Sequence, residues 1–216
     1  MIKGIIFDLD GVLVSTDELH YKAWKKLADE LGITEFTKED NEKQRGVSRM
    51  ESLEVVLQKG SKTYSQEEKE ALAERKNDYY KELLQELDKT AVLPGAFDTL
   101  ADLHRQGLKI AVGSVSKNTP VILEKTGLDV YIDKVSCGLD ITRSKPDPEV
   151  FLVAAKKLEL APGECVVVED SAAGIVAAKA AGMKSLGVGP YYQSLEAVYE
   201  ARGLNEAIDW QAIIEA

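Results

Sequence analysis

The chain has 216 residues, of which 44% are hydrophobic, so it is neither a disordered tail nor a minimal disulfide scaffold. Its 27 basic and 37 acidic side chains give a net charge of −10. That charge argues against a surface that wraps nucleic acid or binds an anionic membrane. Any phosphate bound by this chain is therefore expected at a local site.

The first residues of the chain are apolar, but Asp8 and Asp10 interrupt them and no small-residue cleavage site follows. We therefore predict a core strand here and not a signal peptide. No apolar stretch approaches the ~18 residues needed to span a bilayer, so we expect a soluble, cytoplasmic protein. Cys137 and Cys165 have no metal-ligand spacing, and we expect two reduced, buried thiols.

Short β-rich runs alternate with helical stretches along most of the chain. This alternation predicts βαβ units and a parallel sheet that is buried on both faces. The predicted strands are residues 3–7, 108–113, 133–137, 165–168 and 185–188. Helices are predicted at 96–106, at 147–159 with Asp147 as N-cap, and at 171–181.

The interval between the first strand and Pro94 breaks this alternation, because it contains only helical patterns. Residues 17–31 form an amphipathic pattern, and Ser48 and Ser65 each begin a sequence with capping-box spacing. We predict an all-α unit of residues 17–88, inserted into an α/β core of residues 1–16 and 89–216. The two connections are natural hinges.

Two pairs of acidic residues each follow an apolar strand. Asp8 and Asp10 follow the first strand, and Glu169 and Asp170 follow the fourth, at the carboxyl edge where open α/β sheets bind ligands. Carboxylates this close repel one another unless a cation lies between them or one is protonated, and oxygen ligands favour Mg²⁺. The alternatives are that Asp8 is a turn residue and that Asp170 caps the next helix.

Two further segments can bind phosphate at the same edge. Ser114 ends a predicted strand, and Ser116, Lys117 and Asn118 lead into a helix, where hydroxyls and N–H groups form a phosphate cradle. Ser and Asn also cap helices that bind nothing. Lys145 precedes Pro146, which prevents a helix and can direct the lysine into the cleft; a solvated lysine is the alternative.

These segments together, in chain order, resemble the four motifs of the haloacid dehalogenase (HAD) superfamily of phosphotransferases. The resemblance implies a HAD-like Rossmannoid core with a parallel sheet and an inserted all-α cap. It implies that Asp8 is the nucleophile and Asp10 the general acid/base. Ser114 and Lys145 would hold the transferring phosphoryl group. The implied Mg²⁺ ligands are Asp8, the backbone carbonyl of Asp10, Glu169 and Asp170.

More specific segments resemble the β-phosphoglucomutase family, above all Gly46-Val47-Ser48-Arg49 and Ser116-Lys117-Asn118. The resemblance implies interconversion of β-D-glucose 1-phosphate and glucose 6-phosphate, with glucose 1,6-bisphosphate as activator and intermediate. It implies a monomer that binds small sugar phosphates, without nucleic acid or membrane. The implied substrate-binding residues are Thr16, His20, Trp24, Gly46, Arg49, Ser52, Lys76, Ser116, Lys117 and Asn118.

Three alternatives remain at this level. Residues His20 and Trp24 share a helix face that can instead belong to the core of the cap. A sugar-phosphate phosphatase would use the same catalytic residues with water as the acceptor. A silent binding module would be expected to lose a nucleophile or a metal ligand. Departures from the mutase pattern occur at Ser15, Gln44, Arg45 and residues 140–143.

Overall fold

The computed structural model describes residues 1–44 and 47–216, which divide into two compact units. Residues Met1–Ser15 and Asp88–Ala216 form one unit, called here the core unit. Residues Thr16–Leu87 form the other, called the helical unit. Each boundary lies one residue before the predicted one.

The described part of the core unit is built on a six-stranded sheet in the order β3-β2-β1-β4-β5-β6, with all neighbours parallel. In the central register, Ile6 of β1 lies between Ala111 of β2 and Val167 of β4. Every residue of β1 and β4 is buried, as expected for strands covered on both faces. The strands are Gly4–Phe7 (β1), Lys109–Gly113 (β2), Lys134–Ser136 (β3), Cys165–Glu169 (β4), Lys184–Gly187 (β5) and Tyr199–Glu200 (β6).

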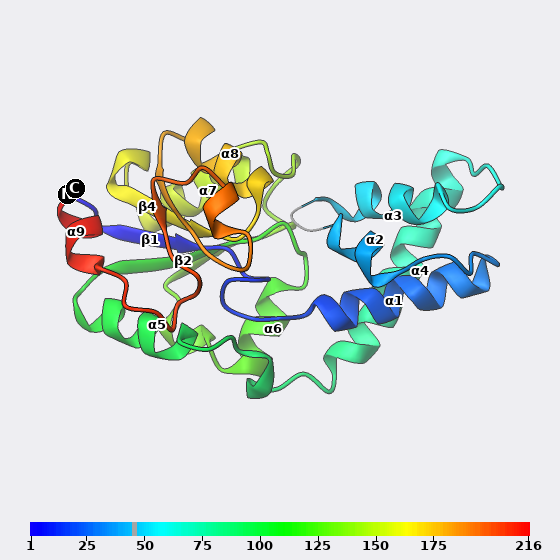
Figure 1. The fold of residues 1–216 in the computed structure, drawn as a ribbon, viewed down its shortest axis with the longest axis horizontal. Helices are drawn as coiled ribbons and strands as arrows, with labels where there is room; N and C mark the ends of the chain where they lie inside the picture. Colours follow the sequence, from blue (N-terminus) through cyan, green and yellow to red (C-terminus); the bar gives the residue numbers. More distant parts are fainter. Residues whose placement is uncertain (45–46) are drawn as a thin grey trace. The chain divides into compact units, whose positions relative to one another are not determined.

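Helices cover both faces of this sheet, with α7 and α8 on one face and α5 and α6 on the other (Figure 1). Short 3₁₀ helices fill several connections, and the last helix lies beside the amino terminus, where the Ile2 N–H donates to Ile214 O at 2.9 Å. The α-helices are Ala96–Arg105 (α5), Thr119–Thr126 (α6), Glu149–Leu158 (α7), Ala172–Ala180 (α8) and Trp210–Glu215 (α9). The 3₁₀ helices are Lys89–Ala91 (η1), Asp129–Tyr131 (η2), Pro162–Glu164 (η3) and Tyr192–Ser194 (η4).

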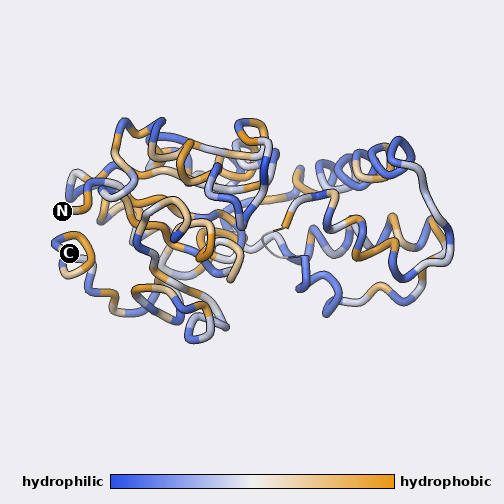
Figure 2. The backbone as a smooth tube through the Cα atoms, turned by 90° about the horizontal axis from the view of Figure 1, so that it is seen from above, coloured by the Kyte–Doolittle hydropathy of each residue, from blue (hydrophilic) through white to orange (hydrophobic). Residues whose placement is uncertain are grey.

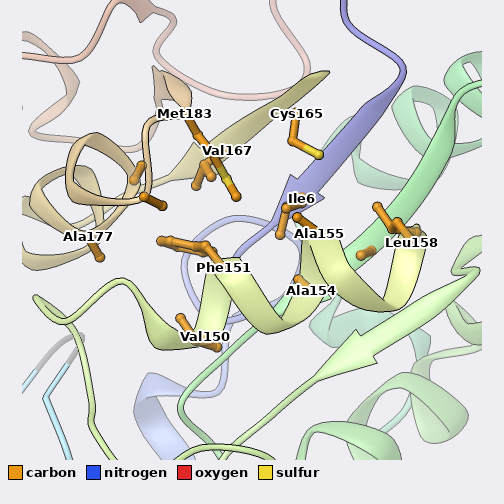
Figure 3. Packing of buried hydrophobic residues seen from close by; sticks show 13 residues of the cluster. Ile6, Val150, Phe151, Ala154, Ala155, Leu158, Cys165, Val167, Ala177 and Met183 are labelled. Carbon is orange, nitrogen blue, oxygen red and sulfur yellow. The ribbon is translucent and has the colours of Figure 1, made fainter. Parts of the chain in front are cut away.

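The hydrophobic core lies where α7 packs on the centre of the sheet. Figure 3 shows Phe151 of α7 beside Val167 of β4, with Ile6 of β1 close by. Both Phe151 and Ile6 are fully buried, and burying a side chain of this size contributes about 1.5–3 kcal/mol. This packing fixes the ends of β1 and β4 relative to the start of α7.

The helical unit has its own apolar core, which contains Trp24, Leu27 and Leu53. Apolar and polar stretches alternate along its helices (Figure 2), as expected for amphipathic helices that face a shared core. Its helices are Asp17–Glu30 (α1), Lys38–Glu42 (α2), Arg49–Leu57 (α3) and Gln66–Leu84 (α4).

Capping boxes begin α2, α3 and α4 of this unit, whereas α1 has no side-chain cap. The two predicted from sequence are confirmed: Ser48 exchanges hydrogen bonds with Glu51, and Ser65 does the same with Glu68. A third box, between Thr37 and Asp40, begins α2. Each box satisfies two N–H groups that the first helical turn leaves without an intrahelical partner.

The structure differs from the sequence prediction in two respects: short elements that were not predicted, and the start of one helix. The short elements β6, α2 and α9 were not predicted, because two to six residues are too few for a periodic pattern. The predicted N-cap Asp147 is wrong, since α7 begins at Glu149 after Pro148. The Asp147 carboxylate still accepts from the Glu149 N–H at 3.0 Å.

The two cysteines, Cys137 and Cys165, are both free and buried, as predicted. Within residues 1–44 and 47–216, no helix has the length and apolar character needed to cross a membrane.

Candidate active site

Three carboxylates meet at the carboxyl edge of the sheet. Asp8 follows β1, Glu169 ends β4 and Asp170 follows it, and one oxygen from each lies within 4.8 Å of the others. The pairing of β1 with β4 brings them together, and the Asp8 N–H donates to Val168 O at 2.9 Å. The alternative that Asp170 caps α8 is wrong, because Ser171 is the cap and its Oγ accepts from the Gly174 N–H at 3.1 Å.

Lys145 joins two of these carboxylates. Its Nζ donates to Asp8 Oδ1 and to Glu169 Oε1, each at 2.6 Å, and lies 4.8 Å from the centre of the Phe151 ring. The lysine is only 2% exposed, so the alternative of a solvated side chain is wrong. The Lys145–Pro146 peptide bond, whose isomer the sequence leaves open, is cis.

Burial and neighbouring charges shift the pKa values of this cluster. Burial raises the pKa of Asp8 to about 7; Lys145 lowers it, while Glu169 and Asp10 raise it further. Burial alone would lower the pKa of the Lys145 ammonium, but Asp8 and Glu169 outweigh burial and raise that pKa above its usual value. The lysine therefore stays charged and offsets part of the negative charge around it.

Two glycines allow the carboxylates to come this close. A Cβ on Gly11, whose φ is +85°, would lie 2.0 Å from Asp170 Oδ2. A Cβ on Gly174 would lie 1.9 Å from Glu169 Cδ. Sequence reasoning did not identify either glycine as a site residue, although Gly11 directly follows the two aspartates of the first motif.

The donor set fits a hard divalent cation. Three buried carboxylates with one counter-charge leave negative charge uncompensated, and Mg²⁺ favours such oxygen ligands. Asp8, Glu169 and Asp170 would hold the ion. The Asp10 carboxylate is not part of the three-residue cluster found among the described residues. Asp10 is half-buried and forms an isolated bridge with Val14, and coordination through its backbone carbonyl stays a prediction.

Ser114 and the following loop lie at the same edge. Ser114 is 3% exposed, directly follows β2, and its Oγ accepts from the Ser116 N–H at 3.2 Å. The Ser116 Oγ accepts from the Asn118 N–H at 3.2 Å, and Lys117 is exposed. Asn118 is the N-cap of α6, and its side chain makes no capping hydrogen bond.

The loop before Lys145 is fixed by the start of α7, although its sequence departs from the mutase pattern. Glu149 accepts from the N–H groups of Thr142 and Arg143 at 3.0 and 2.7 Å. Asp140 accepts from the Cys137 N–H at 2.9 Å and pairs with Lys157 at 2.7 Å. Sequence reasoning missed Glu149, whose first-turn position in α7 is the available signal.

In the helical unit, Lys76 lies in a set of rings. Its Nζ is 2.9 Å from His20 Nδ1, 4.6 Å from the Trp24 ring centre and 4.8 Å from that of Tyr80. An ammonium only donates, so Nδ1 accepts and the imidazole is the neutral tautomer with its proton on Nε2. Consistently, burial, Lys76 and Arg49 hold the pKa of His20 well below its usual value.

Tyr80 completes this arrangement and was missed by sequence reasoning. Its ring stacks on that of His20 at 4.1 Å, and its hydroxyl donates to the Thr16 Oγ1 at 3.1 Å. The available signal is its position one helical turn after Lys76. Trp24 is 2% exposed and packs in the core of the helical unit. For this residue, the alternative that its helix face belongs to the core of the cap is therefore correct.

The remaining predicted residues of this unit lie around α3. Arg49 begins α3, and its Nη1 donates to Glu74 Oε2 at 3.0 Å. Ser52 is 5% exposed, and its carbonyl accepts from Gln44 Nε2 at 3.0 Å. The predicted substrate residue Gly46 lies outside the described residues.

Comparison with known proteins gives a family match over most of the chain. The sequence model of the haloacid dehalogenase-like hydrolases matches residues 5–188. The chain is 40% identical over 190 residues to a β-phosphoglucomutase of Bacillus subtilis, covering 87% of this chain and 84% of that protein. It is 28% identical over 209 residues to a phosphorylated carbohydrates phosphatase of Thermotoga maritima, covering 95% and 91%.

A solved structure shows the same fold. The crystal structure of β-phosphoglucomutase from Clostridium difficile superposes with a TM-score of 0.90 and 39% sequence identity, covering 99% of this chain and 96% of that one. The α/β core with a parallel sheet and inserted helices, predicted from sequence, is thus confirmed.

Proposed function

This chain belongs to the haloacid dehalogenase-like hydrolase family, and on that premise we propose that it acts as a β-phosphoglucomutase. It interconverts β-D-glucose 1-phosphate and glucose 6-phosphate through an aspartyl-phosphate enzyme and glucose 1,6-bisphosphate. The observation that carries this proposal is the buried cluster of Asp8, Lys145, Glu169 and Asp170 in a chain 40% identical to a β-phosphoglucomutase.

Asp8 is the nucleophile of the proposed reaction. One of its carboxylate oxygens attacks the phosphorus, and the bond between phosphorus and the sugar oxygen breaks. Lys145, 2.6 Å from Asp8 Oδ1, offsets the repulsion between the carboxylate and the dianionic phosphate. Mg²⁺, held by Asp8, Glu169 and Asp170, would supply further positive charge to the transferring phosphoryl group. Ser114 and Lys145 donate hydrogen bonds to its oxygens.

Asp10 is the proposed general acid and base. It donates a proton to the leaving sugar oxygen when Asp8 is phosphorylated, and removes one from the attacking sugar hydroxyl when the phosphoryl group returns. Its position two residues after the nucleophile, in the tight turn that Gly11 makes possible, supports this role. The neutral His20, with its proton on Nε2, is proposed to position the Asp10 carboxyl through a hydrogen bond.

Mutase activity requires a second phosphate site, since glucose 1,6-bisphosphate carries two phosphates. Arg49 of the helical unit and Ser116, Lys117 and Asn118 of the core unit are proposed to hold the phosphate that is not transferred. This assignment requires the helical unit to close over the core during turnover. Closure would also keep water from the aspartyl phosphate.

The sugar itself is proposed to contact the helical unit. Thr16, His20 and Lys76 lie together there and offer hydroxyl, imidazole and ammonium groups to sugar hydroxyls. Trp24 acts through the position of Lys76, since its own ring is buried. Ser52 is proposed to complete the lining, and Gly46 stays a substrate-binding residue predicted from sequence. We further propose a cytoplasmic monomer with small sugar phosphates as its partners.

The second candidate is a sugar-phosphate phosphatase, which the similarity to the Thermotoga maritima phosphatase favours. Water would then accept the phosphoryl group from Asp8. The two functions are distinguished by incubating the protein with Mg²⁺, β-glucose 1-phosphate and a trace of glucose 1,6-bisphosphate. We expect glucose 6-phosphate to form faster than inorganic phosphate. If release of inorganic phosphate dominates, the protein is a phosphatase and not a mutase.

A further inference from the structure

The guanidinium of Arg49 already has an anionic partner within the helical unit. Arg49 Nη1 donates to Glu74 Oε2 at 3.0 Å, and Glu74 Oε1 accepts from Asn77 Nδ2 at 3.1 Å and from Lys81 Nζ at 3.4 Å. Asn77 is buried, whereas the Arg49 side chain is 24% exposed and that of Glu74 58% exposed. The hydrogen bond from Asn77 and the charge of Arg49 both lower the pKa of Glu74, so the carboxylate is ionised at neutral pH.

We propose that Glu74 is a counter-charge that weakens the binding of the non-transferred phosphate by Arg49. This inference rests on the proposed function, in which Arg49 holds that phosphate. Glu74 itself is a positioning residue, because it acts through Arg49. Its effect is to let the bisphosphate intermediate leave the arginine and exchange its two ends within each turnover.

The geometry favours repulsion between Glu74 and a phosphate bound to Arg49. It does not favour the alternative, in which Glu74 orders the Arg49 side chain for phosphate binding. A guanidinium has five N–H donors, so a phosphate can bind the donors that Glu74 does not use. The phosphate dianion and the Glu74 carboxylate then bind the same guanidinium, and their like charges repel, although Lys81 offsets part of the carboxylate charge. Glu74 is more than half exposed, and such an ion pair orders an arginine only weakly. Removal of the carboxylate charge should therefore strengthen phosphate binding.

The chain offers matched variants to test this. Glu74→Gln keeps the length and a hydrogen-bond acceptor but removes the charge, whereas Glu74→Asp keeps the charge. Glu70→Gln removes a charge from the same helix at an exposed residue that pairs with Gln66. Binding of glucose 6-phosphate in the presence of Mg²⁺ is measured by calorimetry, which does not depend on turnover.

We expect Glu74→Gln to lower the Kd for glucose 6-phosphate about three- to tenfold, and its kcat as a mutase to fall. Glu74→Asp and Glu70→Gln should stay within about twofold of the wild type. An unchanged or higher Kd in Glu74→Gln would overturn the proposal that Glu74 acts as a counter-charge. A Glu74→Asp variant that behaves like Glu74→Gln would do the same. Failure of the mutase function would appear separately, as dominant phosphate release by the wild type.

Discussion

The two units each contain a buried lysine, but they hold it in different ways. Lys145 of the core unit is paired with two buried carboxylates at 2.6 Å. Lys76 of the helical unit instead contacts an imidazole nitrogen and two ring faces. The first arrangement concentrates opposite charges for chemistry on phosphorus. The second places a cation and a neutral histidine together, which suits recognition of a hydroxylated, anionic ligand.

The net charge of −10 does not predict the local charge around either lysine. Acidic residues gather in the core unit where a cation can offset them, while Lys76 and Arg49 are near enough to His20 to lower its pKa. A sugar phosphate can therefore bind a strongly acidic protein, because the charges that matter are the local ones.

The largest effect is expected from Asp8→Asn in the core unit. The amide cannot form the aspartyl phosphate, so mutase turnover should fall at least about 1000-fold. Coupled measurement of glucose 6-phosphate formation checks this. Substantial turnover in the variant would contradict the covalent mechanism, whereas binding of glucose 6-phosphate by calorimetry provides the control for folding.

A smaller loss is expected from Gly174→Ala. The new methyl group would lie 1.9 Å from Glu169 Cδ, so the carboxylate must move away from Lys145 and the cation site. Apparent affinity for Mg²⁺ should fall about 10- to 100-fold, as measured by activity and by calorimetry.

The matched control for that change is Gly163→Ala. A Cβ on Gly163 would have no described neighbour within 4 Å, and its backbone conformation is one that alanine adopts. Its Mg²⁺ affinity should match the wild type. Equal affinities in all three proteins would show that the fit of Glu169 against Gly174 does not matter for metal binding.

Lys76→Met tests the buried lysine of the helical unit. Loss of the ammonium should raise the KM for β-glucose 1-phosphate at least about tenfold, because a charge-assisted hydrogen bond is lost. It should also raise the pKa of His20, since burial lowers that pKa first and Lys76 adds to it. NMR titration of His20 measures the second effect. Lys69→Met, on the same helix and paired with Glu54 at 2.7 Å, is the control. No change in either quantity for Lys76→Met would refute the assignment.

The smallest expected effect is that of pH on the free energy of unfolding. Its direction is opposite for Asp8 of the core unit and Asp40 of the helical unit. Burial raises the pKa of Asp8 to about 7. Its contribution to stability is therefore fully present below its unfolded pKa of about 4 and is lost as pH rises through 7. For Asp40, burial opposes ionisation, but Lys59 and the Thr37 N–H outweigh it and lower the pKa. Its contribution is present above about pH 4 and lost in stronger acid.

Urea unfolding without Mg²⁺ can separate these effects. Relative to Asp8→Asn, the wild type should lose stability between pH 4 and 7. Relative to Asp40→Asn, it should gain stability as pH rises from 2 to 5, reaching about 1–3 kcal/mol. The same pH trend in both comparisons would be incompatible with the opposite pKa shifts.

Motifs at strand ends made most of the core unit predictable from sequence. Asp8 and Glu169 each follow an apolar strand, and parallel strands end at one edge, so their meeting required no detailed knowledge of packing. The capping boxes at Ser48 and Ser65 were equally local and were also predicted. The strand β6 was not, because two residues have no periodicity.

The residues that sequence reasoning missed act through side-chain contacts that depend on the folded path of the chain. Tyr80 matters because its ring stacks on His20, and Glu149 because it binds the loop before Lys145. Gly174 matters because the Glu169 side chain occupies the place of its missing Cβ. Tyr80 and His20 lie far apart in sequence, whereas Glu149 and Gly174 contact residues only a few positions earlier, across a turn whose path neither propensity nor spacing specifies.

The central claim is that phosphate passes from Asp8 to a sugar. It is tested most directly with glucose 1,6-bisphosphate labelled with ³²P, which is incubated with the enzyme and Mg²⁺ and then chased with unlabelled β-glucose 1-phosphate. We predict that a labelled peptide containing Asp8 forms and that the chase moves its label into sugar phosphates. Transfer of that label mainly to inorganic phosphate, or labelling that persists in Asp8→Asn, would contradict the claim.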